Sequence, residues 1–184
     1  AADKVIIDNL TPKFTGGLNL GVSWKNLSLF GQFSFTYGGK IYNLDEQLLR
    51  STELGYDDVM KNKPDYILDR WTQENQSSRY PRFVVGAHGA QNETGWNDRP
   101  STLYLFDASF LKLNKLTLSY NLPQNWIQKL GMTSCSVYLS GENLFTLKNK
   151  KLNVPDPEAA LTSGIAQKGV PSPRSFMIGL DLTF

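Results

Sequence analysis

The sequence contains very little cysteine and histidine. Cys135 and His88 are the only residues of their kinds among 184. A single cysteine excludes an internal disulfide framework, and together the two residues cannot supply the ligands of a structural zinc site. We therefore expect no metal, no cofactor and no nucleophilic chemistry, because His88 stands in a loop without partners. The chain is predicted not to be an enzyme.

Long apolar runs and runs of one charge are also absent. No stretch approaches the roughly 18 apolar residues of a transmembrane helix. The formal net charge of +2 is spread along the chain, so no basic patch indicates a nucleic-acid partner. A membrane protein built from strands stays possible, because alternating strands leave only a weak trace in the hydropathy.

Five stretches alternate between apolar and polar residues with the period of two that is typical of half-buried strands. The expected strands cover about 14–24, 27–37, 109–122, 133–147 and 175–184. Lys25 and Asn26 form a tight turn, which makes the first two strands a hairpin. In the third stretch, Leu111 and Leu113 fall out of phase with the leucines that follow, which predicts a β-bulge or an upper half outside the membrane.

Two long segments, about 38–108 and 148–173, separate these strands and are expected to be loops. The connections at 25–26 and 123–132 are short, and the second has room for one helical turn. Short and long connections therefore alternate, as they do in outer-membrane barrels, where the long loops face outward.

Alternation alone is compatible with a transmembrane barrel and with a soluble β-sandwich. The polar faces of the first two strands carry no charge, only small neutral groups that suit a hydrated barrel interior. Aromatic residues near the strand ends suit an interfacial girdle; they are Trp24, Tyr37, Tyr120 and Phe184. We therefore predict an all-β fold, an antiparallel transmembrane β-barrel segment. The alternative is a soluble β-sandwich or small barrel that grips a glycan with Trp71 and Trp96.

The barrel prediction assigns ten apolar side chains to the lipid. They are Leu18, Leu20, Val22, Leu29, Phe33, Phe35, Val137, Leu139, Ile178 and Leu180. On the opposite face, Glu142 and Asp181 are expected to be hydrogen-bonded carboxylates in the lumen rather than an acid/base pair.

The chain ends on SFMIGLDLTF, which resembles the carboxy-terminal assembly signal of outer-membrane barrels. In that signal a final Phe follows an apolar residue two positions earlier and a glycine five positions earlier. Gly179, Leu182 and Phe184 match it, whereas Met177 stands where a polar residue is usual.

Several longer stretches point to one family. They are TPKFTGGLNLGVSWKNLSLFGQFSFTYGGKIYN, RWTQENQSSRYPRF, SFLKLNKLTLSYNLP, SVYLSGENLFTL and PSPRSFMIGLDLTF. In order and spacing they resemble the carboxy-terminal end of the SusC/RagA family of TonB-dependent outer-membrane transporters of Bacteroidetes. The start AADKVIID has no targeting signal, which suggests that residue 1 is not a true amino terminus.

The resemblance implies a barrel of about 22 strands, of which this chain holds about five, closed by a plug from the remaining segment. It implies import of oligosaccharides or peptides across the outer membrane, with energy delivered by TonB. It also implies a SusD-like surface lipoprotein that acts as a lid.

The first long loop holds the candidate residues for contact with substrate or lid. Aromatic rings stack on sugars or fill peptide pockets, and arginine forks bind carboxylates. The candidates are Arg70, Trp71, Arg79, Tyr80, Arg82 and Trp96. The competing interpretation, which we favour, is that RWTQENQSSRYPR packs the outer mouth or seats the lipoprotein, because members with different substrates share it. Asp156 and Glu158 lack the spacing of a calcium loop and are expected to form a turn.

Overall fold

The computed structural model describes residues 9–50, 53–54, 62–78, 80–82, 84–85, 100–161, 163–167 and 169–184. The chain divides into two compact units, each with its own buried residues. Unit 1 comprises Ala1–Ile7, Ile41–Phe106 and Glu158–Gly169, and unit 2 comprises Asp8–Lys40, Asp107–Pro157 and Val170–Phe184. No helix among the described residues is long and apolar enough to cross a membrane.

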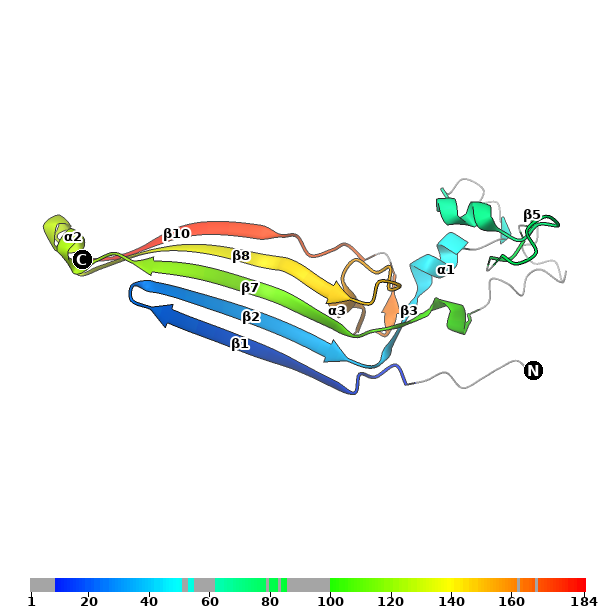
Figure 1. Ribbon diagram of the computed structural model, residues 1–184, viewed down its shortest axis with the longest axis horizontal. Helices are drawn as coiled ribbons and strands as arrows, with labels where there is room; N and C mark the ends of the chain where they lie inside the picture. Colours follow the sequence, from blue (N-terminus) through cyan, green and yellow to red (C-terminus); the bar gives the residue numbers. More distant parts are fainter. Residues whose placement is uncertain are drawn as a thin grey trace. The chain divides into compact units, whose positions relative to one another are not determined.

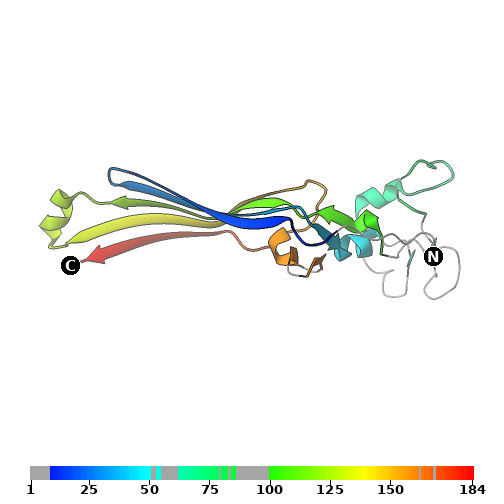
Figure 2. The ribbon, with the colours of Figure 1, turned by 90° about the horizontal axis from the view of Figure 1, so that it is seen from below.

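Unit 2 is built on one antiparallel sheet of five strands (Figure 1). The strands are β1 (Phe14–Trp24), β2 (Leu27–Tyr37), β7 (Phe110–Asn121), β8 (Ser134–Lys148) and β10 (Ser175–Thr183). Their order across the sheet is β1-β2-β7-β8-β10. The predicted mainly antiparallel β fold is therefore confirmed. Figure 2 shows these strands as a single twisted layer, and among the described residues of unit 2 no second sheet packs on it to form the alternative β-sandwich.

The register places most apolar residues of the five strands on one face of the sheet, whereas Phe30 and Phe110 lie on the other face. Leu18 pairs with Phe33, and Val22 pairs with Leu29 across the first hairpin. Leu139 of β8 lies between Leu118 of β7 and Ile178 of β10. The ten side chains that the sequence assigned to the lipid all share this face, which we call the apolar face.

The predicted β-bulge is confirmed in β7. The register shifts between Leu113 and Lys115, so that Asn114 is the extra residue opposite β2. Because one residue is added, the apolar phase reverses, and Leu113 joins Leu116 on the apolar face. Ser34 donates a hydrogen bond to the Asn114 side chain at 3.3 Å, which holds the bulge on the polar side.

The short connections lie at one end of the sheet, together with the carboxy terminus (Figure 1). Lys25 turns the first hairpin with a φ of 54°. Between β7 and β8, the expected helical turn is α2 (Gln124–Ile127), followed by the 3-10 turn η3 (Gln128–Leu130). Gly131 ends this turn with a φ of 70°, where a glycine is free of side-chain strain.

The two long segments predicted as loops, about 38–108 and 148–173, are not structureless. They contain short elements: β3 (Lys40–Asn43), α1 (Leu44–Arg50), β4 (Glu53–Leu54), η1 (Asp65–Asp69), β5 (Val84–Val85), η2 (Thr102–Tyr104), β6 (Leu105–Asp107), α3 (Pro157–Leu161) and β9 (Ile165–Ala166). A three-stranded sheet of order β6-β3-β9 links parts of both segments. Strands of two to four residues are too short to show a period of two, which explains why the sequence pattern missed them.

Gly179 of β10 lies directly beside Tyr138 of β8 in the sheet register. A Cβ atom at Gly179 would stand 2.3 Å from Cζ of the Tyr138 ring. The glycine of the predicted assembly signal therefore leaves space for an aromatic ring on the polar face. Leu182 and Phe184, the other two residues of that signal, are 47% and 79% exposed.

Candidate binding site

A cavity of about 530 Å³ in unit 1 brings together part of the predicted loop cluster. We call it the loop cavity. Its lining residues are Trp71, Ser78, Tyr80, Pro81, Arg82, Leu103 and Tyr104. Two segments that are distant in the sequence, 71–82 and 103–104, thus form one concave surface.

Hydrogen bonds close the segment that carries the aromatic residues. The backbone N–H of Trp71 donates to the carbonyl of Tyr80 at 2.9 Å, which joins the two ends of the loop. Within the loop, Asn75 donates to the carboxylate of Asp69 at 2.8 Å, and the Ser78 hydroxyl donates to the Asp69 carbonyl. The loop is therefore shaped by its own polar residues, as short asparagine- and serine-rich loops often are.

Tyr80 is held by a stack of flat groups behind the loop cavity. Its ring stacks on Tyr66 with a centroid distance of 5.2 Å, and the guanidinium of Arg50 lies 5.4 Å from each of the two rings. Glu46, which is 3% exposed, accepts hydrogen bonds from Arg50 at 2.5 Å and from the Tyr66 hydroxyl at 2.8 Å. These contacts attach the loop to α1 and η1 and leave Tyr80 little freedom to move.

The floor of the loop cavity is Tyr104, which is only 2% exposed. Tyr42 of β3 packs edge-on against it, with ring centroids 6.2 Å apart. The Tyr42 hydroxyl in turn donates to Gln47 of α1 at 2.5 Å. The floor is therefore supported by the same short elements that support Tyr80.

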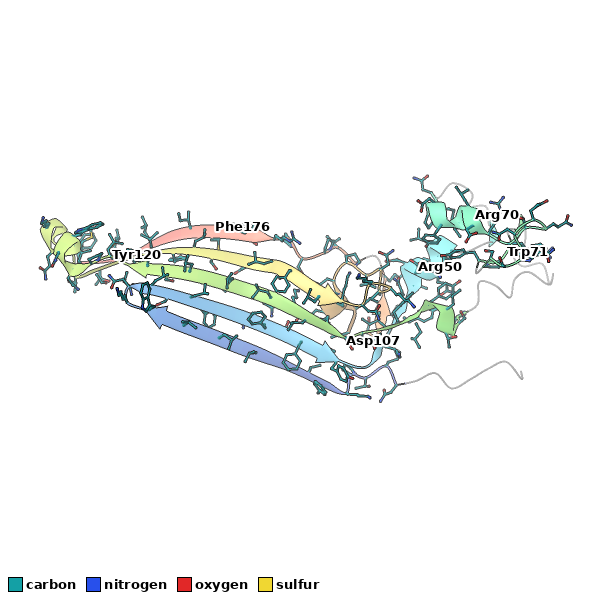
Figure 3. The ribbon with its side chains drawn as sticks, viewed as in Figure 1. Arg50, Arg70, Trp71, Asp107, Tyr120 and Phe176 are labelled. Atoms are coloured by element: carbon teal, nitrogen blue, oxygen red, sulfur yellow. The ribbon has the colours of Figure 1, made fainter. Side chains whose placement is uncertain are left out.

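The structure brings together Trp71, Tyr80 and Arg82 of the predicted cluster. Trp71 is 37% exposed and Arg82 is exposed, so both are accessible to a ligand. Arg70 forms a β-bridge with Tyr80 but does not line the cavity. Figure 3 labels Arg70 and its neighbour Trp71. Arg79 and Trp96 lie outside the described residues. Sequence reasoning missed Leu103 and Tyr104, because no local signal joins them to a segment more than twenty residues earlier.

The chemistry available in the loop cavity is that of a binding surface. An indole face packs on apolar or sugar surfaces, and a guanidinium pairs with carboxylates. In the described part of the chain, no three His, Cys, Asp or Glu side chains gather as metal ligands. The surface suits contact with an extended ligand or a protein partner.

The stack of Tyr66, Tyr80 and Arg50 predicts that the local stability of this loop depends on pH. Burial, with the hydrogen bond to Glu46, raises the pKa of Tyr66 from 10.0 to about 12. A raised pKa means that the fold favours the neutral hydroxyl, so its stabilising contribution is complete below pH 10 and is lost as the pH rises through about 12. Tyr66→Phe removes the titrating group. We expect the wild type to be locally more stable than Tyr66→Phe below pH 10, as measured by hydrogen exchange of residues 65–80. This difference in stability is expected to shrink between pH 10 and about pH 12. An advantage that stays constant to pH 12 would contradict the assignment.

Comparison with known proteins places these features in context. No family model matches the chain. The chain is 29% identical over 191 residues to the TonB-dependent receptor P26 of Formosa agariphila, covering 99% of this chain and 18% of that protein. The TonB-dependent receptor SusC of Bacteroides thetaiotaomicron is 26% identical over 185 residues, covering 100% of this chain and 16% of the relative.

The chain also resembles solved structures of a transporter. The RagAB peptide importer in its closed-closed state matches with a TM-score of 0.78 and 30% identity, over 97% of this chain and 18% of that chain. Its open-open state matches with a TM-score of 0.75 at the same identity. The chain thus spans less than a fifth of the length of the relatives it matches. The predicted resemblance and the outer-membrane location are confirmed by these similarities.

Proposed function

We propose that this chain, which resembles SusC- and RagA-like TonB-dependent receptors along its whole length, forms wall strands of an outer-membrane barrel that imports oligosaccharides or peptides. The observation that carries the proposal is the single-layered sheet of unit 2, with one apolar face and one polar face. Such a sheet suits a wall between lipid and a water-filled lumen.

The apolar face carries large side chains that are strongly exposed. Leu20 is 51% exposed, Val22 is 67% exposed and Ile178 is 79% exposed. A continuous apolar surface of this kind is rare on a monomer in water. We propose that the ten predicted residues of this face contact lipid.

Strand lengths and strand ends support the same proposal. β1 and β2 have 11 residues each and β10 has 9, which fits the roughly 9–11 residues of a tilted transmembrane strand. Aromatic residues stand at both ends of the sheet: Phe14 stacks on Tyr37 at one end, and Trp24 and Phe184 lie at the other. These are the positions of interfacial girdles in barrels.

The polar face suits a hydrated lumen. Hydroxyls pair across neighbouring strands, as between Ser23 and Ser28 at 2.9 Å and between Thr117 and Ser140 at 2.9 Å. Lys115 lies 4.0 Å from the carboxylate of Glu142, so that this carboxylate is paired across β7 and β8. Small polar groups and charges on this face are typical of a hydrated barrel lumen and not of a hydrophobic core.

Both edges of the sheet need further strands. β1 and β10 each pair with one neighbour among the described strands, and unpaired backbone groups are costly in lipid. We infer that further strands complete a barrel of about 22 strands and that a plug closes it. TonB is the proposed source of energy. Gly179, Leu182 and Phe184 are the proposed assembly signal.

The loop cavity is the proposed contact site for the substrate or for a SusD-like lipoprotein lid. Tyr80 has a structural role in it, because its ring is already committed to Tyr66 and Arg50. Trp71 and Arg82 supply the accessible contacts.

Uptake by the full-length protein in its own host tests this proposal. Labelled oligosaccharide and peptide mixtures are offered to cells with and without the protein, before and after the proton gradient is collapsed. We expect the protein to be required for uptake of one class and uptake to stop without the gradient. Trp71→Ala is expected to reduce uptake about thirtyfold, since truncation of an aromatic residue at an interface hot spot costs about 2 kcal/mol.

Trp126→Ala is the matched control, because Trp126 is 64% exposed on α2 in unit 2. It is expected to leave uptake unchanged. Uptake that needs neither the protein nor the gradient would overturn the import function. Equal uptake by the two tryptophan variants would overturn only the role of the loop cavity.

A further inference from the structure

A second cavity, of about 250 Å³, lies in unit 2 where β7 and β8 meet the segments that flank α3 and precede β10. We call it the cationic cavity. Its charged and hydroxyl-bearing lining residues are Lys112, Thr146, Lys148, Asp156, Ser172 and Arg174. In the sheet register, Lys112 pairs with Thr146 and Lys148 pairs with Phe110, which places both lysines on the polar face.

The walls of the cationic cavity are fixed by hydrogen bonds. Asp156 accepts from Lys112 at 3.0 Å and from the Ser172 hydroxyl at 2.8 Å. Lys148 donates to the carbonyl of Val154, and Asn143 donates to the carbonyl of Pro173 at 3.0 Å. Two separate chain segments are thereby fastened to the strand ends. The cavity is a built feature of unit 2.

The charges around this cavity do not balance. Three cationic side chains line it, and Asp156 is the one carboxylate among its lining residues. The side chains of Lys112 and Asp156 are 6% and 9% exposed and form an ion pair, so they neutralise each other. Lys148 also lies in the field of Asp156, but one carboxylate cannot balance three cations, so a formal excess of two positive charges remains.

Both remaining cations have hydrogen-bonding capacity to spare. The Lys148 ammonium has three donors, and the hydrogen bond to Val154 uses one of them. Arg174 is exposed, and within the described residues it forms no ion pair. A guanidinium fork beside an ammonium is well suited to an oxyanion with several acceptor oxygens.

We propose that the cationic cavity binds a carboxylate or sulfate group of the transported molecule. This inference rests on the proposed function, in which the polar face of the sheet lines the lumen. The cavity volume is below the roughly 300–1,000 Å³ of sites that enclose a whole small ligand. It therefore takes one acidic unit of an oligomer, and the protein selects anionic oligosaccharides or peptides over neutral ones.

Matched probe pairs test this preference on the full-length protein in detergent. Trialanine and its carboxy-terminal amide differ in a carboxylate, and galactose 6-sulfate and galactose differ in a sulfate. Isothermal titration is expected to show that the charged member of at least one pair binds about tenfold more tightly, because hydrogen bonds to charged groups are the stronger ones. The pair that shows the difference identifies the oxyanion.

Amino-acid substitutions test whether the preference for the charged probe arises in the cationic cavity. Lys148→Gln with Arg174→Gln is expected to abolish it, and Arg174→Gln alone to reduce it severalfold. The single variant stands outside the strands, so it tests the site even if the double variant fails to assemble. Lys150→Gln is the control, since Lys150 is an exposed neighbour that does not line the cavity.

Equal binding of the charged and neutral probes, including no binding of either, would overturn the inference. So would a preference that survives Arg174→Gln unchanged. The two hypotheses fail in different measurements. If only the proposed function is wrong, cells without the protein keep normal uptake, whereas the purified protein still binds the charged probe more tightly than the neutral one.

Discussion

Asp156→Ala is expected to destabilise unit 2 by about 3–5 kcal/mol, the usual cost of removing one partner of a buried ion pair. The Lys112 ammonium would then lose the carboxylate that lies 3.0 Å away, in a site where its side chain is 6% exposed. Ser172 would lose its acceptor at the same time. Most of the cost comes from the desolvated cation that is left behind.

Hydrogen exchange of the full-length protein measures this effect locally, in peptides that cover β7 and residues 149–157. Exchange there is expected to rise by two or more orders of magnitude. Asp181→Ala is the matched control, because Asp181 is an exposed carboxylate on β10. Replacement of both partners, Lys112→Met with Asp156→Leu, is expected to restore much of the protection, since the buried charge disappears with its partner. Unchanged exchange in Asp156→Ala would show that the pair does not hold the segment.

Leu20→Arg is expected to prevent assembly of the barrel. Leu20 lies near the middle of β1, on the apolar face, and an arginine facing lipid near the midplane costs about 2–4 kcal/mol. The amount of folded, heat-modifiable protein in the outer-membrane fraction measures the outcome. We expect Leu20→Arg to be nearly absent from that fraction.

The control for this variant is its neighbour. Asn19→Arg adds the same side chain to the opposite face of the same strand, where the proposed lumen contains water. It is expected to assemble at close to the wild-type level. If both arginine variants assemble equally well, the apolar face does not contact lipid, and the proposed orientation of the sheet is wrong.

The sheet of unit 2 could be predicted because its determinants are local. Each strand has at least nine residues and alternates along most of its length, and a one-residue slip would turn every side chain to the other face. Even the bulge at Asn114 could be predicted, since an extra residue reverses the apolar phase of Leu113. Local patterns of this length determine which residues share a face.

The binding features could not be predicted in the same way, because they depend on residues that are distant in the sequence. Lys112 and Asp156 are 44 residues apart, and nothing near either residue indicates the other. The stack of Arg50, Tyr66 and Tyr80 joins three short elements with no periodicity of their own. Loop residues of the right chemical type could be named, but their partners required the fold.

The space that Gly179 leaves for the ring of Tyr138 also selects among pairings of β10 with β8. A slip of two residues keeps every apolar side chain on its own face, so alternation does not oppose it. Such a slip would bring Met177 or Asp181 beside Tyr138, and the ring of Tyr138 would have to leave the space that it occupies over Gly179. The glycine therefore favours a single alignment of the last strand, because the misaligned pairings that hydrophobicity alone would accept displace the ring of Tyr138.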